Sequence, residues 1–270
     1  MSTIADRRRT FRDLHRRGCF VIPNPWDAGS ARVLAQLGFL ALATTSSGFA
    51  WSIGRSDNHV TLDQALAYMD AVARTVDVPV SADFEGGFAI APADVGANVA
   101  RAAATAISGL SIEDSTHDAT QPLFEFGLAV DRVRAARRAI DDTGTPLVLT
   151  ARTEGFIVGR PDLAETIRRL KAFAEAGADC LYAPGMRDKD AIAAVVTAVA
   201  PKPVNVLVGS DFTTVSDLAA IGVRRISVGG ALARSAWTGF LEAATEIAEC
   251  GTFAKLTQSV PGSELNARFA

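Results

Sequence analysis

Two acidic residues stand two positions apart at the end of a short apolar run, in the stretch VPVSADFEGGF at residues 78–88. Because alternate residues of an extended chain point to the same side, Asp83 and Glu85 can lean toward one site. Gly86 and Gly87 follow, and they let the chain turn without a side chain in front of the acids. Carboxylate oxygens in such a pair are suitable ligands for a hard cation such as Mg²⁺ or Mn²⁺.

Two further acids extend this candidate metal site. Glu113 ends the apolar run ISGLSIE, and Asp57 lies in the polar stretch that follows the run at 39–45. Mg²⁺ commonly takes one or two carboxylates directly and keeps several of its waters. We therefore expect Asp83 to bind the metal directly, and Glu85, Glu113 and Asp57 to hold metal-bound waters. The expected cofactor is Mg²⁺ or Mn²⁺.

A substrate anion has its own candidate partners. Arg152 ends the run PLVLTAR, and a guanidinium group binds a carboxylate through two parallel hydrogen bonds. The turn Ser47-Gly48-Phe49 can offer a hydroxyl and backbone N–H groups to the same anion. Asn205 is a further polar group, within the run PVNVL. The expected partner is a small-molecule carboxylic acid.

Each acid also has a more ordinary explanation. Asp and Glu are common just before helices, where they cap the first turn and face the positive end of the helix dipole. Helix capping explains any one of these acids well, but it does not explain why several of them gather at one place. Acids that converge on one place without a cation repel one another and resist ionisation. Their convergence therefore favours a metal site.

The elements that position these residues repeat along the chain. Short apolar runs alternate with longer amphipathic segments, and buried parallel strands have this continuous apolar character. Eight such units predict a (β/α)8 barrel, or TIM barrel, whose C-terminal strand ends meet at one mouth. A doubly wound open sheet is the alternative, but no G-x-G-x-x-G turn follows the first run. The expected strands are 20–23, 39–45, 78–83, 107–113, 146–152, 179–184, 203–207 and 225–229.

The chain is predicted to form a single domain over residues 1–270. Its barrel core covers about 18–250, an amphipathic helix precedes it, and the tail at 251–270 has no assigned structure. A formal net charge of −3 and a pI near 5.7 give no basic field for nucleic acid or an anionic membrane. The three cysteines are far apart, no secretory signal is evident, and no apolar run is long enough to span a bilayer, so we expect a cytoplasmic protein.

Several long stretches resemble the isocitrate lyase/phosphoenolpyruvate mutase superfamily over about residues 10–255. The resemblance implies a Mg²⁺-dependent enzyme that makes or breaks C–C or P–C bonds next to a 2-oxo or 2-hydroxy acid, through a metal-chelated enolate like that of pyruvate. It also implies a homotetramer, a dimer of helix-swapped dimers, in which residues after about 230 pack on a partner. The stretches are NPWDAGSARVLAQLGF, ATTSSGFAWSIGRSDN, SADFEGGF, GLSIEDS, TARTEGF, AEAGADCLYAPG, KPVNVL and GVRRISVGGAL.

Residue by residue, the resemblance agrees with the candidate site. It implies that Asp83 is the direct metal ligand and that Asp57, Glu85 and Glu113 hold its waters. It implies carboxylate binding and a polar substrate contact at Ser47, Gly48, Phe49, Arg152 and Asn205.

The loop after the fourth run narrows the chemistry. Isocitrate and methylisocitrate lyases carry a K-K-C-G-H-type motif there, whereas this chain reads IEDSTHDATQPLFE, without a cysteine. Mutases and phosphonopyruvate hydrolases have a longer loop with an asparagine, and none stands between Ser115 and Glu125. Decarboxylation of an oxaloacetate-type acid needs neither group and is the favoured C–C bond reaction. A P–C bond enzyme and a non-catalytic small-acid binder are the alternatives.

His117 lies on the same loop. It could protonate the enolate that bond cleavage leaves, because an imidazole can give up a proton near neutral pH. The alternative is an ordinary solvated histidine of a surface loop. The expected catalytic residues are Arg152, Glu113, Ser47 and His117.

Overall fold

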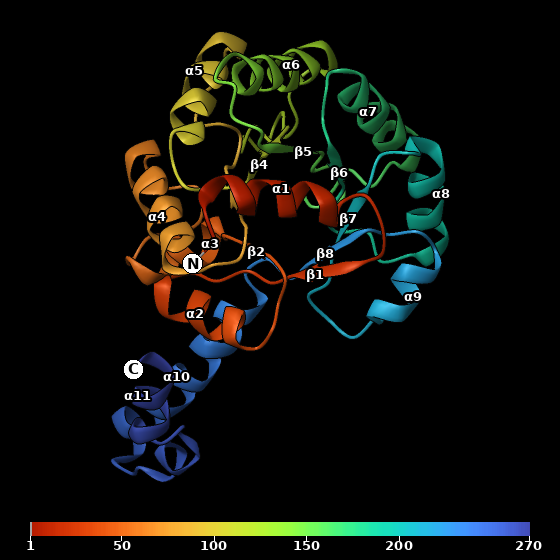
Figure 1. Cartoon of the computed structure of the whole chain (residues 1–270). Helices are drawn as coiled ribbons and strands as arrows, with labels where there is room; N and C mark the ends of the chain where they lie inside the picture. Colours follow the sequence, from red (N-terminus) through yellow and green to blue (C-terminus); the bar gives the residue numbers. More distant parts are fainter. Residues whose placement is uncertain (1) are drawn as a thin grey trace.

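Eight parallel strands form a nearly closed barrel with helices around it, which confirms the (β/α)8 prediction (Figure 1). The structure is a computed structural model and describes residues 2–270. Neighbouring strands pair in the order β1-β8-β7-β6-β5-β4-β3-β2. The strands are β1 (Phe20–Ile22), β2 (Leu42–Ala43), β3 (Val80–Asp83), β4 (Gly109–Glu113), β5 (Val148–Arg152), β6 (Cys180–Tyr182), β7 (Val204–Leu207) and β8 (Arg225–Ser227).

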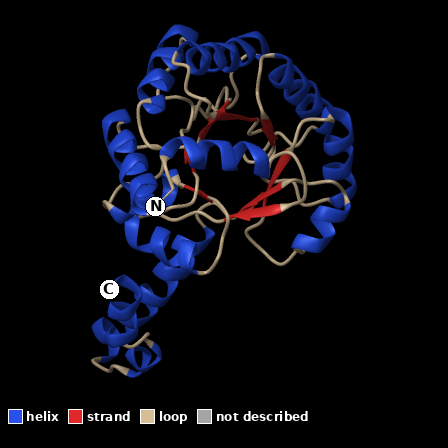
Figure 2. Ribbon diagram, viewed as in Figure 1, coloured by secondary structure: helices blue, strands red, loops and turns tan. Residues whose placement is uncertain are grey.

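The helices surround the barrel as an outer layer (Figure 2). Their ends carry the local signals that stop and start helices: Thr61 and Gln64 form a capping box for α4, and Pro92 occupies the first turn of α5. The helices are α1 (Ile4–Leu14), α2 (Ala28–Gln36), α3 (Ser46–Ser52), α4 (Leu62–Thr75), α5 (Pro92–Ala103), α6 (Phe126–Asp142), α7 (Leu163–Glu175), α8 (Lys189–Val199), α9 (Val215–Ala220), α10 (Ala231–Cys250), the 3₁₀ turn η1 (Ala254–Gln258) and α11 (Gly262–Phe269).

The N-terminal helix α1 lies across one end of the barrel (Figure 1). Its Phe11 is fully buried and packs with Phe20, Ile22 and Val148. Gly109 is needed beneath it, because a Cβ there would lie 2.7 Å from the Phe11 ring. This end carries the N-terminal starts of the strands, so the mouth where the polar residues gather is at the opposite end.

The seam between β1 and β2 is closed largely by one side chain. Asn24 donates from Nδ2 to the carbonyl of Thr44 at 3.0 Å. Its Oδ1 accepts the N–H groups of Val228 and Gly229, each at 2.9 Å. A backbone hydrogen bond from Ala43 to the carbonyl of Pro23, at 3.0 Å, adds to the closure. Asn24 therefore joins the ends of β1, β2 and β8.

The C-terminal region leaves the barrel. Helix α10 extends away from it, and η1 and α11 follow, so the tail that had no assigned structure is helical (Figure 1). The end of the chain returns to α2, where Gln36 donates to the carbonyl of Arg268 at 2.6 Å.

Helix α3 differs from the prediction, because the sequence indicates only a turn at Ser47-Gly48-Phe49. It is short and follows strand β2 almost directly, so its residues carry too few helical repeats for a periodic pattern. As for the membrane, none of the helices over residues 2–270 combines the length and apolar character of a transmembrane span.

Candidate active site

Asp83 lies at the mouth, held by the neighbouring β2–α3 connection. Its Oδ2 accepts the N–H of Ser46 at 3.0 Å, and its own N–H donates to Thr44 Oγ1 at 2.9 Å. These bonds fix the backbone and one carboxylate oxygen. The other oxygen, Oδ1, faces Arg152.

Arg152 is the centre of the cluster. Its Nη1 lies 3.5 Å from Asp83 Oδ1 and 3.2 Å from Glu113 Oε2, and its Nε pairs with Glu154. The guanidinium carbon stands 5.4 Å from the centre of the Tyr182 ring. Burial opposes the charge on Arg152, but the carboxylates of Glu113, Glu154 and Asp83 outweigh it and raise the pKa of the guanidinium. Arg152 is therefore a permanent cation.

One cation among so many acids leaves a surplus of negative charge. Burial, then repulsion from Asp83 and Asp57, raises the pKa of Glu85 to about 8. Burial is also the main cause that raises the pKa of Glu113, with Glu154 and Asp83 adding to it. The pKa of Asp57 rises because of burial and the charge of Asp83. Each shift would be relieved by a further positive charge.

The donor set fits a hard divalent cation. Asp83, Glu85, Glu113 and Asp57 all offer carboxylate oxygens, the ligands that Mg²⁺ and Mn²⁺ prefer. Among residues 2–270, no three His, Cys, Asp or Glu side chains converge closely enough to form a ready-made cage for a metal ion. A bound ion would therefore need waters or substrate oxygens to complete its coordination.

Glu85 is held in a strained conformation. Its φ of +47° lies in the left-handed region, which a residue with a Cβ adopts at a cost of roughly 1–2 kcal/mol. Such strain is found at functional sites because the surrounding structure enforces it. Here the enforced turn places the Glu85 side chain, 8% exposed, among the acids.

The Ser47-Gly48-Phe49 segment forms the first turn of α3. Thr45 caps the helix: its Oγ1 accepts the N–H of Gly48, and its carbonyl accepts the N–H of Phe49. These two N–H groups are thus used inside the helix, unlike the free turn expected. Gly48 is required, since a Cβ would lie 2.8 Å from the Thr45 methyl. The Ser47 hydroxyl lies 3.1 Å from Thr45 Oγ1.

Asn205 lies in the barrel interior. Its Nδ2 donates to Ser227 at 2.9 Å, and its Oδ1 accepts from Arg225 Nε at 2.9 Å. Arg225 in turn lies 3.3 Å from Nε2 of His15, near the N-terminal end of the barrel. The amide of Asn205 is therefore used by the neighbouring strand β8, and no contact joins it to Asp83 or Arg152 over residues 2–270.

His117 sits beside Glu113. Residues 115 and 123 form an antiparallel bridge, so the loop folds back as a hairpin over the mouth. The Nε2 atom of His117 lies 3.5 Å from Glu113 Oε1. Burial lowers the pKa of the imidazole, so the ring is neutral at neutral pH. With 41% of its side chain exposed, His117 is both near the cluster and open to water.

Two buried arginines beneath the mouth were not anticipated from the sequence. Arg169 pairs with Asp114 at 3.0 Å, and Asp114 also accepts the N–H of Glu154 at 2.9 Å, so Asp114 is a structural acid. Arg132 donates to the carbonyl of Gly86, and its guanidinium lies 3.8 Å from the centre of the Phe124 ring. Both arginines stand inside helical patterns that look like ordinary amphipathic helix, which hides them from a sequence reading.

The raised pKa of Glu85 predicts a pH-dependent stability. The pKa of Glu85 is 4.5 in the unfolded chain and about 8 in the metal-free folded protein. Between these two pH values the unfolded state therefore binds fewer protons than the folded state. The stability that Glu85 contributes is complete below pH 4.5 and is lost as the pH rises through 8. Mg²⁺ should oppose this loss, so we expect it to raise Tm more at pH 8 than at pH 6, measured by calorimetry.

Two variants check the assignment to this residue. Glu85→Gln should shrink the difference in Mg²⁺-induced Tm shift between the two pH values. Glu175→Gln, on the exposed end of α7, should leave it unchanged. If Mg²⁺ shifted the Tm of the unmodified protein equally at both pH values, the pH dependence assigned to Glu85 would be wrong.

Comparisons with known proteins identify the family of the chain. The family model described as phosphoenolpyruvate phosphomutase matches residues 11–248. A crystal structure from Burkholderia cenocepacia J2315, provisionally called a lyase/mutase, is 48% identical with a TM-score of 0.95, covering 99% of this chain and 96% of that chain.

Two relatives have named activities. Oxaloacetate decarboxylase of Pseudomonas savastanoi pv. phaseolicola is 29% identical over 202 residues, which are 72% of this chain and 68% of the relative. The structure of oxaloacetate acetylhydrolase in complex with its product oxalate is 25% identical with a TM-score of 0.87, covering 99% of this chain and 95% of that one.

The family match covers most of the chain, and the barrel fold agrees with it throughout. Members of the superfamily are enzymes with lyase activity and are generally dependent on a divalent metal. The chain is an enzyme of the lyase type that belongs to the phosphoenolpyruvate phosphomutase family, within the phosphoenolpyruvate mutase/isocitrate lyase superfamily.

Proposed function

We propose that this enzyme decarboxylates a small 3-carboxy-2-oxo acid of the oxaloacetate type, with Mg²⁺ or Mn²⁺ as cofactor. The observation that carries the proposal is the convergence of Arg152 with Asp83 and Glu113 at the mouth. The named activities of two relatives, a decarboxylase and an acetylhydrolase, both take oxaloacetate as substrate.

The residues have distinct roles in this proposal. Asp83 would hold the metal, with Glu85, Glu113 and Asp57 on its waters. The metal, when bound, would withdraw electrons from the oxygens of the oxo acid. Arg152 and the Ser47 hydroxyl would hold the substrate carboxylate next to the oxo group and so fix the orientation of the bond that breaks.

The reaction breaks the bond between C3 and the distal carboxylate. CO₂ leaves, the bonding electron pair stays on the C3 side as an enolate of pyruvate, and a proton must then reach C3. Glu113 and His117, whose Oε1 and Nε2 atoms lie 3.5 Å apart, are the candidate groups for passing this proton from water to C3. The 115–125 loop lacks the cysteine of the isocitrate lyases. Decarboxylation does not require that cysteine, because another acid can deliver the single proton that C3 needs.

The test measures products from three substrates, each with Mg²⁺ and with chelator. Pyruvate and CO₂ from oxaloacetate, above the rate that Mg²⁺ alone produces, would support the proposal. Oxalate and acetate from oxaloacetate would indicate hydrolytic C–C cleavage instead. Pyruvate and phosphate from phosphonopyruvate would indicate P–C cleavage. Tight oxalate binding without any turnover would indicate a small-acid binder.

We also propose that a second copy of the chain covers α10, in a homotetramer built from helix-swapped dimers. Trp237 and Phe240 of this helix are in edge-to-face contact, and Phe240 is 60% exposed. Leu241 on the same helix and Phe253 beyond it are also more than half exposed. So large an apolar surface is typical of a protein–protein interface.

A double variant of α10 should dissociate the assembly. Trp237→Ala together with Phe240→Ala is expected to reduce the sedimentation coefficient toward that of a 28.3 kDa monomer in analytical ultracentrifugation. Removing two aromatic anchors commonly costs several kcal/mol of association free energy, about 2 or more for each residue. Leu37→Ala with Ile90→Ala, two exposed apolar residues of the barrel, is the matched control. A monomeric unmodified protein would refute this proposal.

A further inference from the structure

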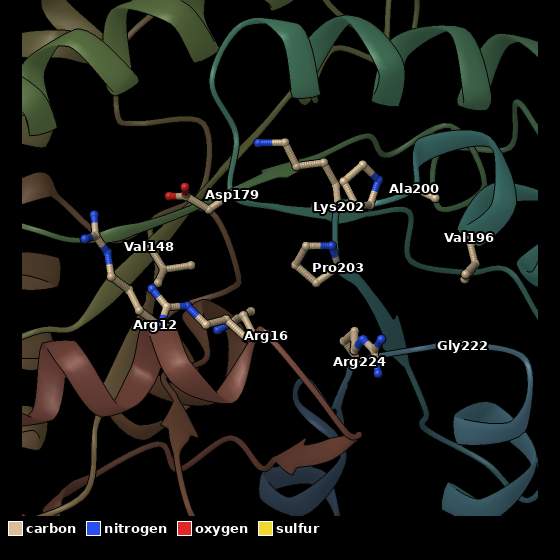
Figure 3. A pocket seen from close by; sticks show the side chains of 12 residues that line it. Arg12, Arg16, Val148, Asp179, Val196, Ala200, Lys202, Pro203, Gly222 and Arg224 are labelled. Atoms are coloured by element: carbon tan, nitrogen blue, oxygen red, sulfur yellow. The ribbon is translucent and has the colours of Figure 1, made fainter.

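A basic cavity lies at the N-terminal end of the barrel, opposite the mouth. Its volume is about 630 Å³. The end of α1 forms one wall, and the segments that lead into β6, β7 and β8 form the others (Figure 3). The polar residues that line it are Arg12, His15, Arg16, Asp179, Lys202 and Arg224.

The cavity is positively charged, although the chain as a whole is negatively charged. Four cations line it and one acid, whereas the whole chain carries a formal charge of −3. The acid, Asp179, is already engaged: it lies 3.1 Å from Nη1 of Arg137 and accepts the N–H of Leu149 at 2.8 Å. It is therefore not available to neutralise the four cations.

The cations are largely without acidic partners. Arg16 pairs with Asp13 at 2.9 Å in a solvent-exposed bridge, which is worth little. Over residues 2–270, Arg12, Lys202 and Arg224 form no ion pair. Figure 3 shows Arg12 and Arg16 on one side of the cavity and Lys202 and Arg224 on the other.

Two of the cations are fixed in place by backbone carbonyl groups. Lys202 Nζ donates to the carbonyl of Ala178 at 2.7 Å, and Arg224 Nη1 donates to the carbonyl of Gly18 at 3.1 Å. A carbonyl orients a cation without cancelling its charge, and each side chain keeps further N–H groups for another acceptor. Lys202 and Arg224 are thus pre-organised for an anion, whereas Arg12 and Arg16 are exposed side chains at the end of α1.

His15 makes a neutral part of the wall. Its Nδ1 lies 2.7 Å from the carbonyl of Phe11, so that nitrogen carries the hydrogen, and Nε2 is left to accept from Arg225 Nη1 at 3.3 Å. Burial and the charge of Arg225 lower the pKa of His15 to about 3. Val148, Val196 and Pro203 add apolar surface beside it.

We propose that this cavity binds a small organic anion that carries two or more negative charges. A volume of about 630 Å³ is within the range of pockets for small metabolites. Guanidinium groups bind phosphate and carboxylate oxygens through paired hydrogen bonds, and the apolar wall can receive the carbon part of the ligand. The site is separate from the mouth and does not depend on the proposed reaction.

The test uses inorganic pyrophosphate and citrate as probes, by isothermal titration calorimetry in low salt. The protein is first treated with a chelator and then dialysed, so that no metal links a probe to the mouth and no chelator competes for the cavity. We expect at least one probe to bind with one site per chain and to bind much more weakly in 0.5 M NaCl, because screening weakens such contacts. Tighter pyrophosphate binding would assign a phosphorylated ligand, and tighter citrate binding a polycarboxylate.

Charge-removing variants locate the site. Arg12→Gln with Arg16→Gln should weaken binding at least tenfold, and Lys202→Gln should weaken it independently. Arg9→Gln with Arg134→Gln removes the same charge from exposed helix positions and should leave binding unchanged. Arg152→Gln should also leave it unchanged, which separates this cavity from the mouth. The inference is wrong if neither probe binds, or if the cavity variants bind as well as the unmodified protein.

Discussion

Replacement of Asp83 by alanine is expected to lower kcat by about 10³-fold or more, which corresponds to about 4 kcal/mol of lost transition-state stabilisation. Asp83 is held through Ser46 and Thr44 at the strand end that faces Arg152. Losing it removes the assigned direct ligand of the metal. Steady-state kinetics with oxaloacetate over a Mg²⁺ titration measure the effect, and excess metal should restore only part of the activity.

The same variant should fold normally. Removing one acid from a cluster of like charges relieves repulsion on Glu85 and Asp57, so the metal-free Tm should stay equal or rise. Asp63→Asn, at an exposed acid of α4, is the matched control and should keep full activity. If Asp83→Ala retained its turnover in the presence of chelator, the metal assignment would be wrong.

Arg152→Gln is expected to have the second large effect, a loss of about 10²–10³-fold in kcat/KM. Arg152 is the cation at the centre of the site, and we assign it to the substrate carboxylate that Ser47 also contacts. Its removal also takes a positive charge away from the acids, so Mg²⁺ should bind at least as tightly as before. Kinetics and Mg²⁺ titration calorimetry on the same preparation separate the two effects.

Arg152→Lys gives a graded comparison. A lysine keeps the charge but lacks the planar fork that binds a carboxylate through two bonds, so its activity should lie between those of the glutamine variant and the unmodified enzyme. Arg134→Gln, at an exposed arginine of α6, serves as control. Weaker Mg²⁺ binding in Arg152→Gln would show that Arg152 supports the metal site rather than the substrate.

The barrel was predictable because its signal is repeated. Each strand is an apolar run that is buried on both faces, and each helix that follows has its own start and stop residues, so errors at single positions do not change the pattern. The convergence of Asp83, Glu113 and Arg152 was also predictable, since the C-terminal ends of barrel strands meet at one mouth.

Other features depend on contacts that no pattern encodes. Asn205 stands at a strand position that suits a substrate contact, yet Arg225 and Ser227 use its amide inside the barrel. The N–H groups of Gly48 and Phe49 were expected to be free, but Thr45 takes both by capping α3. Arg132 reaches Gly86 from a helix 46 positions away. His15, an ordinary helix residue in the sequence, is buried between Phe11 and Arg225.

The closure of the barrel by Asn24 has a consequence for motion. Strands β4 and β5 share a register of five residues, whereas β1 and β2 are joined by one backbone hydrogen bond and by the side chain of Asn24. Transient opening should therefore be easiest at that seam, and the amide hydrogen of Ala43, which bonds across it to Pro23, should exchange with solvent faster than those of β4. Thr44 and Ser46 lie next to the seam, and both form hydrogen bonds with Asp83. Each such opening would therefore weaken the bond between the Ser46 N–H and the Asp83 carboxylate.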